Sequence, residues 1–317
     1  MNKHLKNNIS KTVASSILVG VTAAIILLPH TGAIRATSEY SVHIMLAMLG
    51  LSIVFMLLDQ RRIMFTGFAC TAALALWLKN ASNNNLKLPV SNEEAKLKVA
   101  HVNLSNVDDE LDNLTKIIAD EDIDLLSFQE LTPDWVPAIN QAIAAVYPHK
   151  YSFVRIDPYG MAVYSKFPFE KSDTIQCKGI PSMCLEVKKN GTLFHIVSTY
   201  LAPAFDKTGI ETASAQLKRI SKKVAENNDH LIALGEYNMV YWTPEIRDFR
   251  SSNNLENSRR DIAQGNLRVP YDHIFFSQDL QCVQFKEIIS DTQKYLGILG
   301  TYQLKSDDEL SDELSLR

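Results

Sequence analysis

LLSFQELTPDW, residues 125–135, joins a short strand to the start of a helix. Residues 125–129 have the length and composition of a strand inside a sheet, and Glu130 follows directly. From Trp135 to Val146 the apolar residues recur with the helical period. This strand–helix succession predicts an α/β domain, and the polar residue at the strand end lies where functional sites are usually built.

The alternation of strands and helices continues on both sides of this stretch. Upstream, residues 97–103 predict a strand and residues 108–120 a helix. Downstream, the pattern predicts a long amphipathic helix at about 209–226 and strands at 151–155, 161–165, 173–177, 183–188, 193–200, 231–235, 272–277, 283–288 and 296–304. The soluble domain is therefore expected over residues 97–304.

Charge is unevenly distributed along the 317 residues, which is roughly two domains' length. Residues 1–80 carry seven Lys or Arg and two acidic residues, leaving 25 of the 32 basic and 34 of the 36 acidic residues for the rest. This composition excludes a disordered chain and a disulfide-dense miniprotein. The acidic domain also argues against nucleic acid as a partner, because such a surface repels the phosphate backbone.

Three apolar runs without charged side chains lie at about 12–28, 41–58 and 64–78. Each approaches the ~20 residues that cross a bilayer, so residues 1–79 are predicted to be an all-α transmembrane bundle of three helices. A cleaved signal peptide is the alternative for the first run, and a buried core helix is the alternative for the third. A polar linker at 80–96 and an acidic tail at 305–317 would flank the soluble domain.

The basic residues predict how the three helices are oriented. Five lie in the N-terminal tail and the second loop, namely Lys3, Lys6, Lys11, Arg61 and Arg62, against Arg35 and Lys79 at the other ends. By the positive-inside rule the N-terminus is cytoplasmic. We therefore expect a multi-pass protein of the inner (cytoplasmic) membrane with a periplasmic soluble domain. Its expected partners are the membrane and a membrane protein or complex.

Two cysteines could face each other across a hairpin. Cys177 and Cys184 flank a turn-like stretch, and in an oxidising compartment they would form a disulfide. Two small buried thiols are the equal alternative.

Polar side chains follow several of the predicted strands. These are Asn103, Glu130, Glu236, Asn238 and Asp272. Each alone is more often a turn residue, but together they offer the oxygen ligands that Mg²⁺ or Mn²⁺ prefers.

That combination resembles the endonuclease/exonuclease/phosphatase superfamily, most closely its bacterial branch with N-terminal transmembrane helices. The resemblance covers about residues 96–304. It rests on VNLSN (102–106), LLSFQELTPDW (125–135), YGMAVYSKFP (159–168), STYLAP (198–203), LGEYNMVYWTP (234–244) and LRVPYDHIFFS (267–277). It implies a two-sheet β-sandwich flanked by helices, metal-assisted hydrolysis of phosphoesters, and a buried Trp242.

The resemblance also implies roles for single residues. Glu130 matches the family's metal-binding glutamate, with Asn103 beside it. Asn238 matches the asparagine of the family's GDFN or GDLN motif, in which Glu236 replaces the aspartate. Asp272 matches the aspartate that orients a catalytic histidine.

The family's two catalytic histidines are replaced by tyrosines. Tyr200 and Tyr295 occupy these positions, and no histidine follows His273, which the strand period turns away from Asp272. Tyrosine has a pKa of ~10 and carries no positive charge near neutral pH. Losing one hydrogen-bond donor directed at the transition state typically lowers the rate about 100- to 1,000-fold. The longer side chain of Glu236 could lower it about 100-fold more.

Two functions follow from these residues. The first is a binding or assembly module with impaired catalysis, and the second is a divalent-metal-dependent phosphodiesterase or phosphatase acting on a periplasmic phosphoester or phospholipid headgroup. The altered motifs favour the first. Transport by the helices themselves is disfavoured, because His43 is the one ionisable residue within them.

Overall fold

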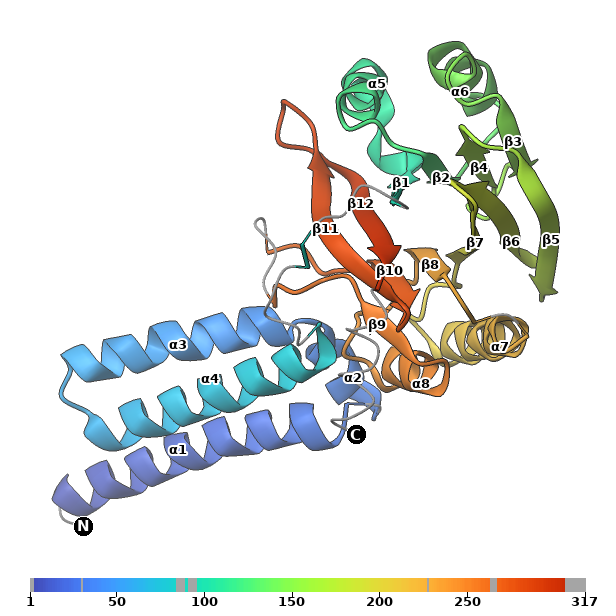
Figure 1. Cartoon of the computed structure of the whole chain (residues 1–317). Helices are drawn as coiled ribbons and strands as arrows, with labels where there is room; N and C mark the ends of the chain where they lie inside the picture. Colours follow the sequence, from blue (N-terminus) through green and yellow to red (C-terminus); the bar gives the residue numbers. More distant parts are fainter. Residues whose placement is uncertain are drawn as a thin grey trace. The chain divides into compact units, whose positions relative to one another are not determined.

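The structure, a computed structural model, describes residues 3–29, 31–83, 89–90, 96–226, 228–262 and 267–305. It divides into two compact units. The helical unit comprises Met1–Asn84, Met239–Arg247 and Arg260–Pro270, and the sandwich unit comprises the rest (Figure 1). Most of the linker expected at 80–96 and of the tail expected at 305–317 lies outside the described residues.

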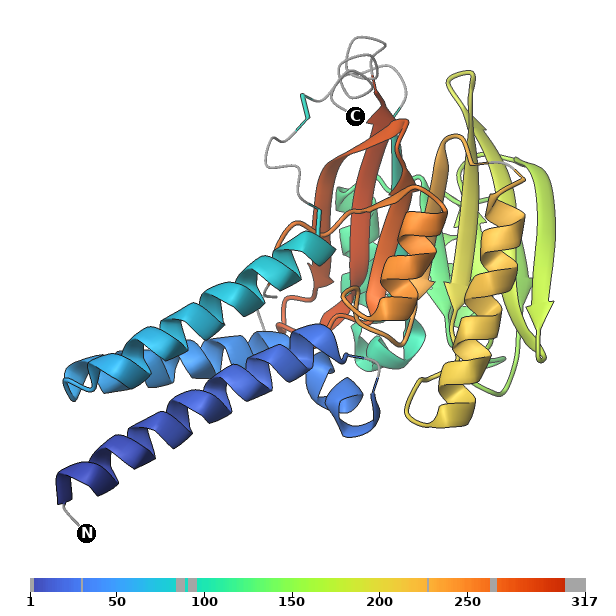
Figure 2. The same ribbon diagram turned by 90° about the horizontal axis from the view of Figure 1, so that it is seen from below.

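Among its described residues the helical unit contains four whole helices and the beginning of α8 (Pro244–Ser252). The whole helices are α1 (Lys3–Leu27), α2 (Gly32–Glu39), α3 (Ser41–Leu57) and α4 (Arg61–Ala81). Three of them cover the apolar runs, and α1, α3 and α4 lie side by side (Figures 1 and 2). Gly67 of α4 lies so close to Ser52 of α3 that an added Cβ would collide with the serine hydroxyl. Such close approach through small residues is common between membrane helices.

Two of these helices, α1 and α4, are long and apolar enough to cross a membrane. Length and composition alone are weak evidence, since signal sequences and core helices share them. The helix α3 is mostly apolar but shorter, at 17 residues.

Segments far along the chain complete the helical unit. The Arg35 guanidinium of α2 forms a 2.5 Å ion pair with Glu245. The Trp242 indole N–H donates to the Ser38 carbonyl at 2.7 Å, and Lys79 Nζ donates to the Arg260 carbonyl at 2.9 Å. The expected burial of Trp242 is confirmed at 1% exposure, but the indole bonds to α2.

Two six-stranded sheets form the sandwich unit and confirm the α/β sandwich. The first has the order β11-β12-β1-β2-β4-β3 and the second β5-β6-β7-β8-β10-β9. The strands are β1 (Leu97–Asn103), β2 (Leu125–Gln129), β3 (His149–Phe153), β4 (Met161–Ser165), β5 (Phe169–Cys177), β6 (Ile180–Lys189), β7 (Thr192–Tyr200), β8 (Leu231–Glu236), β9 (Leu255–Asn257), β10 (Asp272–Ser277), β11 (Leu280–Ile289) and β12 (Tyr295–Leu304).

The strand period explains the two cores. Leu97 and Val99 of β1 face the space between the sheets, whereas Ala100 and Val102 face α5 (Leu111–Asp120) and α6 (Trp135–Ile143). The helix α7 (Lys207–Val224) packs against the second sheet, and α8 (Pro244–Ser252) follows β8 in the chain. Short 3₁₀ turns at Leu104–Asn106 and Asp108–Glu110 link β1 to α5.

The hairpin of β5 and β6 keeps its two cysteines apart. Its turn residues Lys178 and Gly179 have φ of 51° and 80°, so the chain reverses direction immediately after Cys177. Cys177 pairs with Ile180, whereas Cys184 pairs with Asp173 farther along the ladder. Both cysteines are free thiols in the described structure, so the register favours the two-thiol alternative.

Candidate active site

Strand ends from both sheets converge on one end of the space between them. The strands β1, β2, β7 and β8 finish there, and β10 and β12, which run antiparallel to β8 and β1, begin there. Glu236 is in register with Tyr200 on one side and Asp272 on the other. The side chains brought together are those of Asn103, Glu130, Tyr200, Glu236, Asn238, Asp272 and Tyr295.

Asn103 links the two carboxylates of the site. Its Nδ2 donates to Glu130 Oε1 at 2.9 Å and to Glu236 Oε2 at 2.6 Å. Its Oδ1 accepts from the amide and the hydroxyl of Ser105, both at 2.9 Å, which fixes the orientation of the amide. Three residues from separate strand ends therefore meet, as the sequence predicted.

Gln129 supports this cluster from behind. Its Oε1 accepts from the Glu236 amide at 3.0 Å, and its Nε2 donates to the Thr199 carbonyl. Gly235, with φ of 143°, lies against the same carbonyl, and an added Cβ would collide with it. The glycine before Glu236 is thus required by the close approach of β7 and β8.

Tyr200 points its hydroxyl at the same carboxylates. The hydroxyl donates to Glu130 Oε1 at 3.3 Å. Burial raises the pKa of Tyr200 well above its usual value, and the negative charges of Glu236 and Glu130 raise it further. The phenol therefore keeps its proton, and that proton is directed at a carboxylate.

Tyr295 is engaged in the same way by Asp272. Its hydroxyl donates to Asp272 Oδ2 at 2.5 Å. The other carboxylate oxygen, Oδ1, lies 3.2 Å from Nε2 of His101, which assigns the imidazole proton to Nε2. His101 is fully buried, so it can position Asp272 but cannot contact a substrate.

The sequence reasoning did not identify His101 as a site residue. It lies two positions before Asn103 on β1, so both side chains share the face toward the second sheet. This shared strand face was the feature of the sequence that could have identified His101. His273 behaves as expected of a structural residue, because its ring stacks on Phe275 at 5.2 Å, away from the site.

Asn238 lies at the edge of the cluster. Its Nδ2 donates to the Leu201 carbonyl at 2.8 Å, and its side chain also bonds to the Tyr200 hydroxyl. Both Asn238 and Glu130 have positive φ, 50° and 58°. Such conformations concentrate at functional sites, and for glutamate they carry a conformational cost.

The carboxylates of the site are the kind of ligand that binds a divalent cation. Glu130 and Glu236 present carboxylates to one point, and the described groups between them are the Asn103 amide and the Tyr200 hydroxyl. No group of three or more His, Cys, Asp or Glu side chains within the described ranges is placed to hold a metal. The two carboxylates match the hard oxygen ligands of Mg²⁺ or Mn²⁺, whereas the Asn103 amide turns its Nδ2 toward them and its oxygen toward Ser105.

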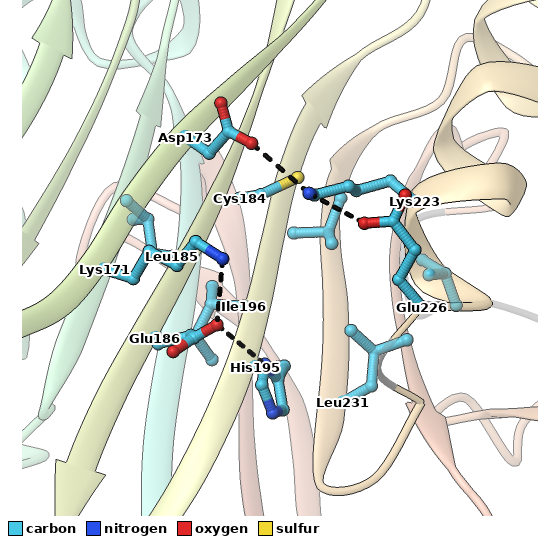
Figure 3. A pocket seen from close by; sticks show the side chains of 12 residues that line it. Lys171, Asp173, Cys184, Leu185, Glu186, His195, Ile196, Lys223, Glu226 and Leu231 are labelled. Atoms are coloured by element: carbon cyan, nitrogen blue, oxygen red, sulfur yellow. Dashed lines mark hydrogen bonds and ion pairs between the residues drawn. The ribbon is translucent and has the colours of Figure 1, made fainter.

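A separate hollow of about 60 Å³ lies on the second sheet beside α7 (Figure 3). Its polar groups pair with one another: Lys223 lies 3.3 Å from Asp173 and 2.9 Å from Glu226, and His195 lies 3.8 Å from Glu186. Burial raises the pKa of the Cys184 thiol to about 12, so it is not a ready nucleophile. The hollow therefore offers no competing catalytic centre.

Comparison with known proteins places this arrangement in context. A model described as "Endonuclease/Exonuclease/phosphatase family" matches residues 100–292. No curated protein matches the sequence. Members of this family usually depend on divalent metals.

Several solved structures share the fold. An endonuclease/exonuclease/phosphatase from Beutenbergia cavernae has a TM-score of 0.55 at 13% identity, covering 67% of this chain and 72% of that one. A family protein from Bacteroides thetaiotaomicron has 0.54 at 13%, covering 67% and 96%. The human Nocturnin catalytic domain with bound sulfate has 0.52 at 16%, covering 68% and 97%. At these identities the likeness establishes the fold alone.

Proposed function

The chain belongs to the endonuclease/exonuclease/phosphatase family, and from that premise we propose that it is a membrane-anchored member acting mainly as a binding or assembly module. Its hydrolytic activity is impaired at the two tyrosine positions. The partner of such a module is a membrane protein or complex. The sandwich unit faces the periplasm, and the N-terminus lies in the cytoplasm.

One observation supports the proposal that hydrolytic activity is impaired. Each tyrosine has a single hydroxyl proton, and both protons are donated to carboxylates, at Glu130 and Asp272. Donating to a phosphoryl oxygen instead would break a charge-assisted hydrogen bond at each position. Neither phenol can supply the positive charge that a histidine offers.

The helical unit supports membrane anchoring with three crossings. The α2 helix and Lys79, which lies near the end of α4, bond to residues of the segments 239–247 and 260–270 in the same unit. The α2 helix and the Lys79 end of α4 must therefore lie on the same side of a membrane. The chain leaves α2 on that side and returns to it at Lys79, so if α4 crosses the membrane, α3 must cross it as well. With α1 crossing, the sandwich faces opposite the N-terminus.

The second candidate function is a divalent-metal-dependent phosphodiesterase or phosphatase acting on a periplasmic phosphoester or phospholipid headgroup. The converging carboxylates of Glu130 and Glu236 favour it. These two residues would hold Mg²⁺ or Mn²⁺, and Asn103, whose Nδ2 donates to both, would position their carboxylates. A bound cation would polarise a phosphoryl oxygen. Asn238, beside the Tyr200 hydroxyl, would orient a water molecule, and Tyr200 would donate to a phosphoryl oxygen.

Metal binding and turnover by the full chain test these functions. The full chain is needed because residues 239–247 belong to the helical unit. The purified protein in detergent is titrated with Mn²⁺ and assayed on bis-p-nitrophenyl phosphate. Wild type and Tyr200→His with Tyr295→His are compared, with Glu130→Ala as the inactive control.

If the wild type shows no turnover and the double variant shows metal-dependent turnover, the impairment is confined to the two tyrosine positions. Turnover by wild type at ordinary rates of about 1–10³ s⁻¹, abolished by Glu130→Ala, would overturn the module and establish the enzyme.

A further inference from the structure

A pocket of about 240 Å³ lies between α5 and α6 in the sandwich unit. Both helices cover the face of the first sheet that is turned away from the second sheet (Figure 1). The walls of the pocket come mainly from the C-terminal halves of the two helices and from the residues that follow them. Helices packed on a sheet usually fill the space between them with side chains, so this space needs an explanation in the residues around it.

Small side chains leave the pocket open. Ala119 of α5 and Ala142 of α6 line it, and their methyl groups are too short to fill the space between the helices. Ile118 and Ile143 also line it, and they are only 4% and 3% exposed because they pack into the core beneath the helices. The pocket therefore has an apolar lining that the core holds in place.

The hydroxyl groups that border the pocket are already bonded within the protein. The Thr115 hydroxyl donates to the Leu111 carbonyl at 2.8 Å, and the Tyr147 hydroxyl donates to the Ile123 carbonyl at 2.7 Å. Each hydroxyl has a single proton, so neither donates to a ligand without losing that bond. These two groups therefore do not select a polar ligand.

The two charged groups that border the pocket are paired with each other. The Lys166 ammonium donates to the Asp122 carboxylate and lies 5.8 Å from the centroid of the Tyr147 ring. The hydrogen bond from Lys166 and its positive charge lower the pKa of Asp122, against the opposing effect of burial. Both groups are therefore charged near neutral pH, and their charges compensate each other. A charged ligand would have to displace one of them.

The surface around the pocket is too polar for a protein partner. Val146, at 56% exposure, is the one large apolar side chain exposed between residues 96 and 150, all of which the structure describes. A stable protein interface buries about 1,200–2,000 Å² and has an apolar centre. One valine beside a pocket does not supply such a centre. The pocket is suited to a small molecule instead.

We propose that this pocket, here called the α5–α6 pocket, binds a small uncharged apolar molecule about the size of a substituted benzene ring. An apolar cavity of about 150 Å³ binds benzene, so 240 Å³ leaves room for a short substituent on the ring. Binding is driven by burial of apolar surface against Ile118 and Ile143, and no hydrogen bond is required. All the residues of the pocket belong to the sandwich unit, so this binding does not depend on membrane anchoring.

Photolabelling of the full chain in detergent tests this binding. The probe is trifluoromethyl phenyl diazirine, a small uncharged aromatic molecule that loses dinitrogen on illumination and attaches to the residues around it. Labelled peptides are identified by mass spectrometry, with ethylbenzene as the competitor. Labelling of α1, which has exposed apolar side chains, measures the probe dissolved in detergent.

Two matched substitutions separate the α5–α6 pocket from the surface beside it. Ala142→Phe places a ring in the pocket. Ala145→Phe is the control, because Ala145 is exposed and does not line the pocket. Ala119→Leu is a second and smaller filling substitution, so a folding defect of one variant does not decide the outcome.

The expected result is saturable labelling of residues 115–122 and 142–147 that ethylbenzene suppresses. This labelling should fall about tenfold in Ala142→Phe, because the added ring occupies the site, and it should be unchanged in Ala145→Phe. Ala119→Leu should lower it as well.

Labelling of these residues that is absent, that does not saturate, or that is equal in all variants would overturn the inference. Labelling that appears only after removal of residues 306–317 would also overturn it and assign the α5–α6 pocket to the chain's own C-terminal segment.

Discussion

Tyr295 donates its hydroxyl proton to Asp272 at 2.5 Å, at a position where the family pattern implies a histidine. The other oxygen of Asp272 lies 3.2 Å from His101. One carboxylate therefore joins β12 and β1 of the first sheet to β10 of the second. The phenol of Tyr295 takes the place of the implied histidine as a partner of Asp272. Asp272 thereby links the two sheets through hydrogen bonds.

Removing the Tyr295 hydroxyl should destabilise the sandwich. We expect Tyr295→Phe to lower the unfolding free energy by about 1.5–3 kcal/mol, because a bond to a charged group is lost inside the fold. The measurement is urea unfolding of the full chain in detergent. Tyr159→Phe is the control, since its ring packs on Tyr200 without a described hydroxyl partner. Equal losses in both variants would contradict the role of the bond.

The buried ion pair of the helical unit should show strong coupling. Arg35→Met leaves the Glu245 carboxylate without its partner, and we expect a loss of about 3–5 kcal/mol in unfolding free energy. The double variant Arg35→Met with Glu245→Met should recover much of this loss, because apolar replacement of both partners is often neutral. Thermal unfolding of wild type, both single variants and the double variant measures this double-mutant cycle. Losses that simply add in the double variant would contradict the prediction.

Acid should weaken the sandwich through Glu121. A hydrogen bond from Lys286, and charges on Lys286 and Lys98, lower the pKa of Glu121 below its usual 4.5, against the opposing effect of burial. Its folded pKa lies below its unfolded one, so its contribution is present above pH 4.5 and is lost as the pH falls through the folded value.

Glu121→Gln should therefore cost about 0.5–1 kcal/mol at pH 7, with the difference from wild type shrinking below pH 4.5. Unfolding midpoints across pH 3–7 check this, with exposed Asp120→Asn as control. A difference that is independent of pH would contradict the assigned cause.

The predicted orientation can be read with two reporters. Alkaline phosphatase fused after residue 317 should be active, and green fluorescent protein at the same place should be dark. The reason is the excess of basic residues at the ends of the helices assigned to the cytoplasm. The reverse pattern would place the sandwich in the cytoplasm.

Much of the sandwich could be predicted from local pattern. Residues 97–103, 125–129 and 161–165 are strands with the predicted bounds, because each is short and rich in apolar residues. The helices α2 and α8 were not predicted. Their sequences, GAIRATSE and PEIRDFRSS, are short and contain few large apolar residues, so their stability depends on tertiary contacts.

The carboxylates and amide of the site could be predicted because each follows a recognisable strand. His101 could not be predicted so readily, since its contact with Asp272 spans 171 residues and joins two sheets. The direction of the tyrosine hydroxyls likewise depends on where Glu130 and Asp272 lie in three dimensions. The boundary of the helical unit depends on Arg35 finding Glu245, which no local pattern encodes.

The ion pair between Arg35 and Glu245 has a consequence for biosynthesis. The two residues are 210 positions apart, and at a synthesis rate of about 5–20 residues per second the second follows the first by roughly 10–40 s. During that interval α2 has emerged with an arginine whose final partner does not yet exist. The helical unit therefore completes its fold only after most of the sandwich has been made.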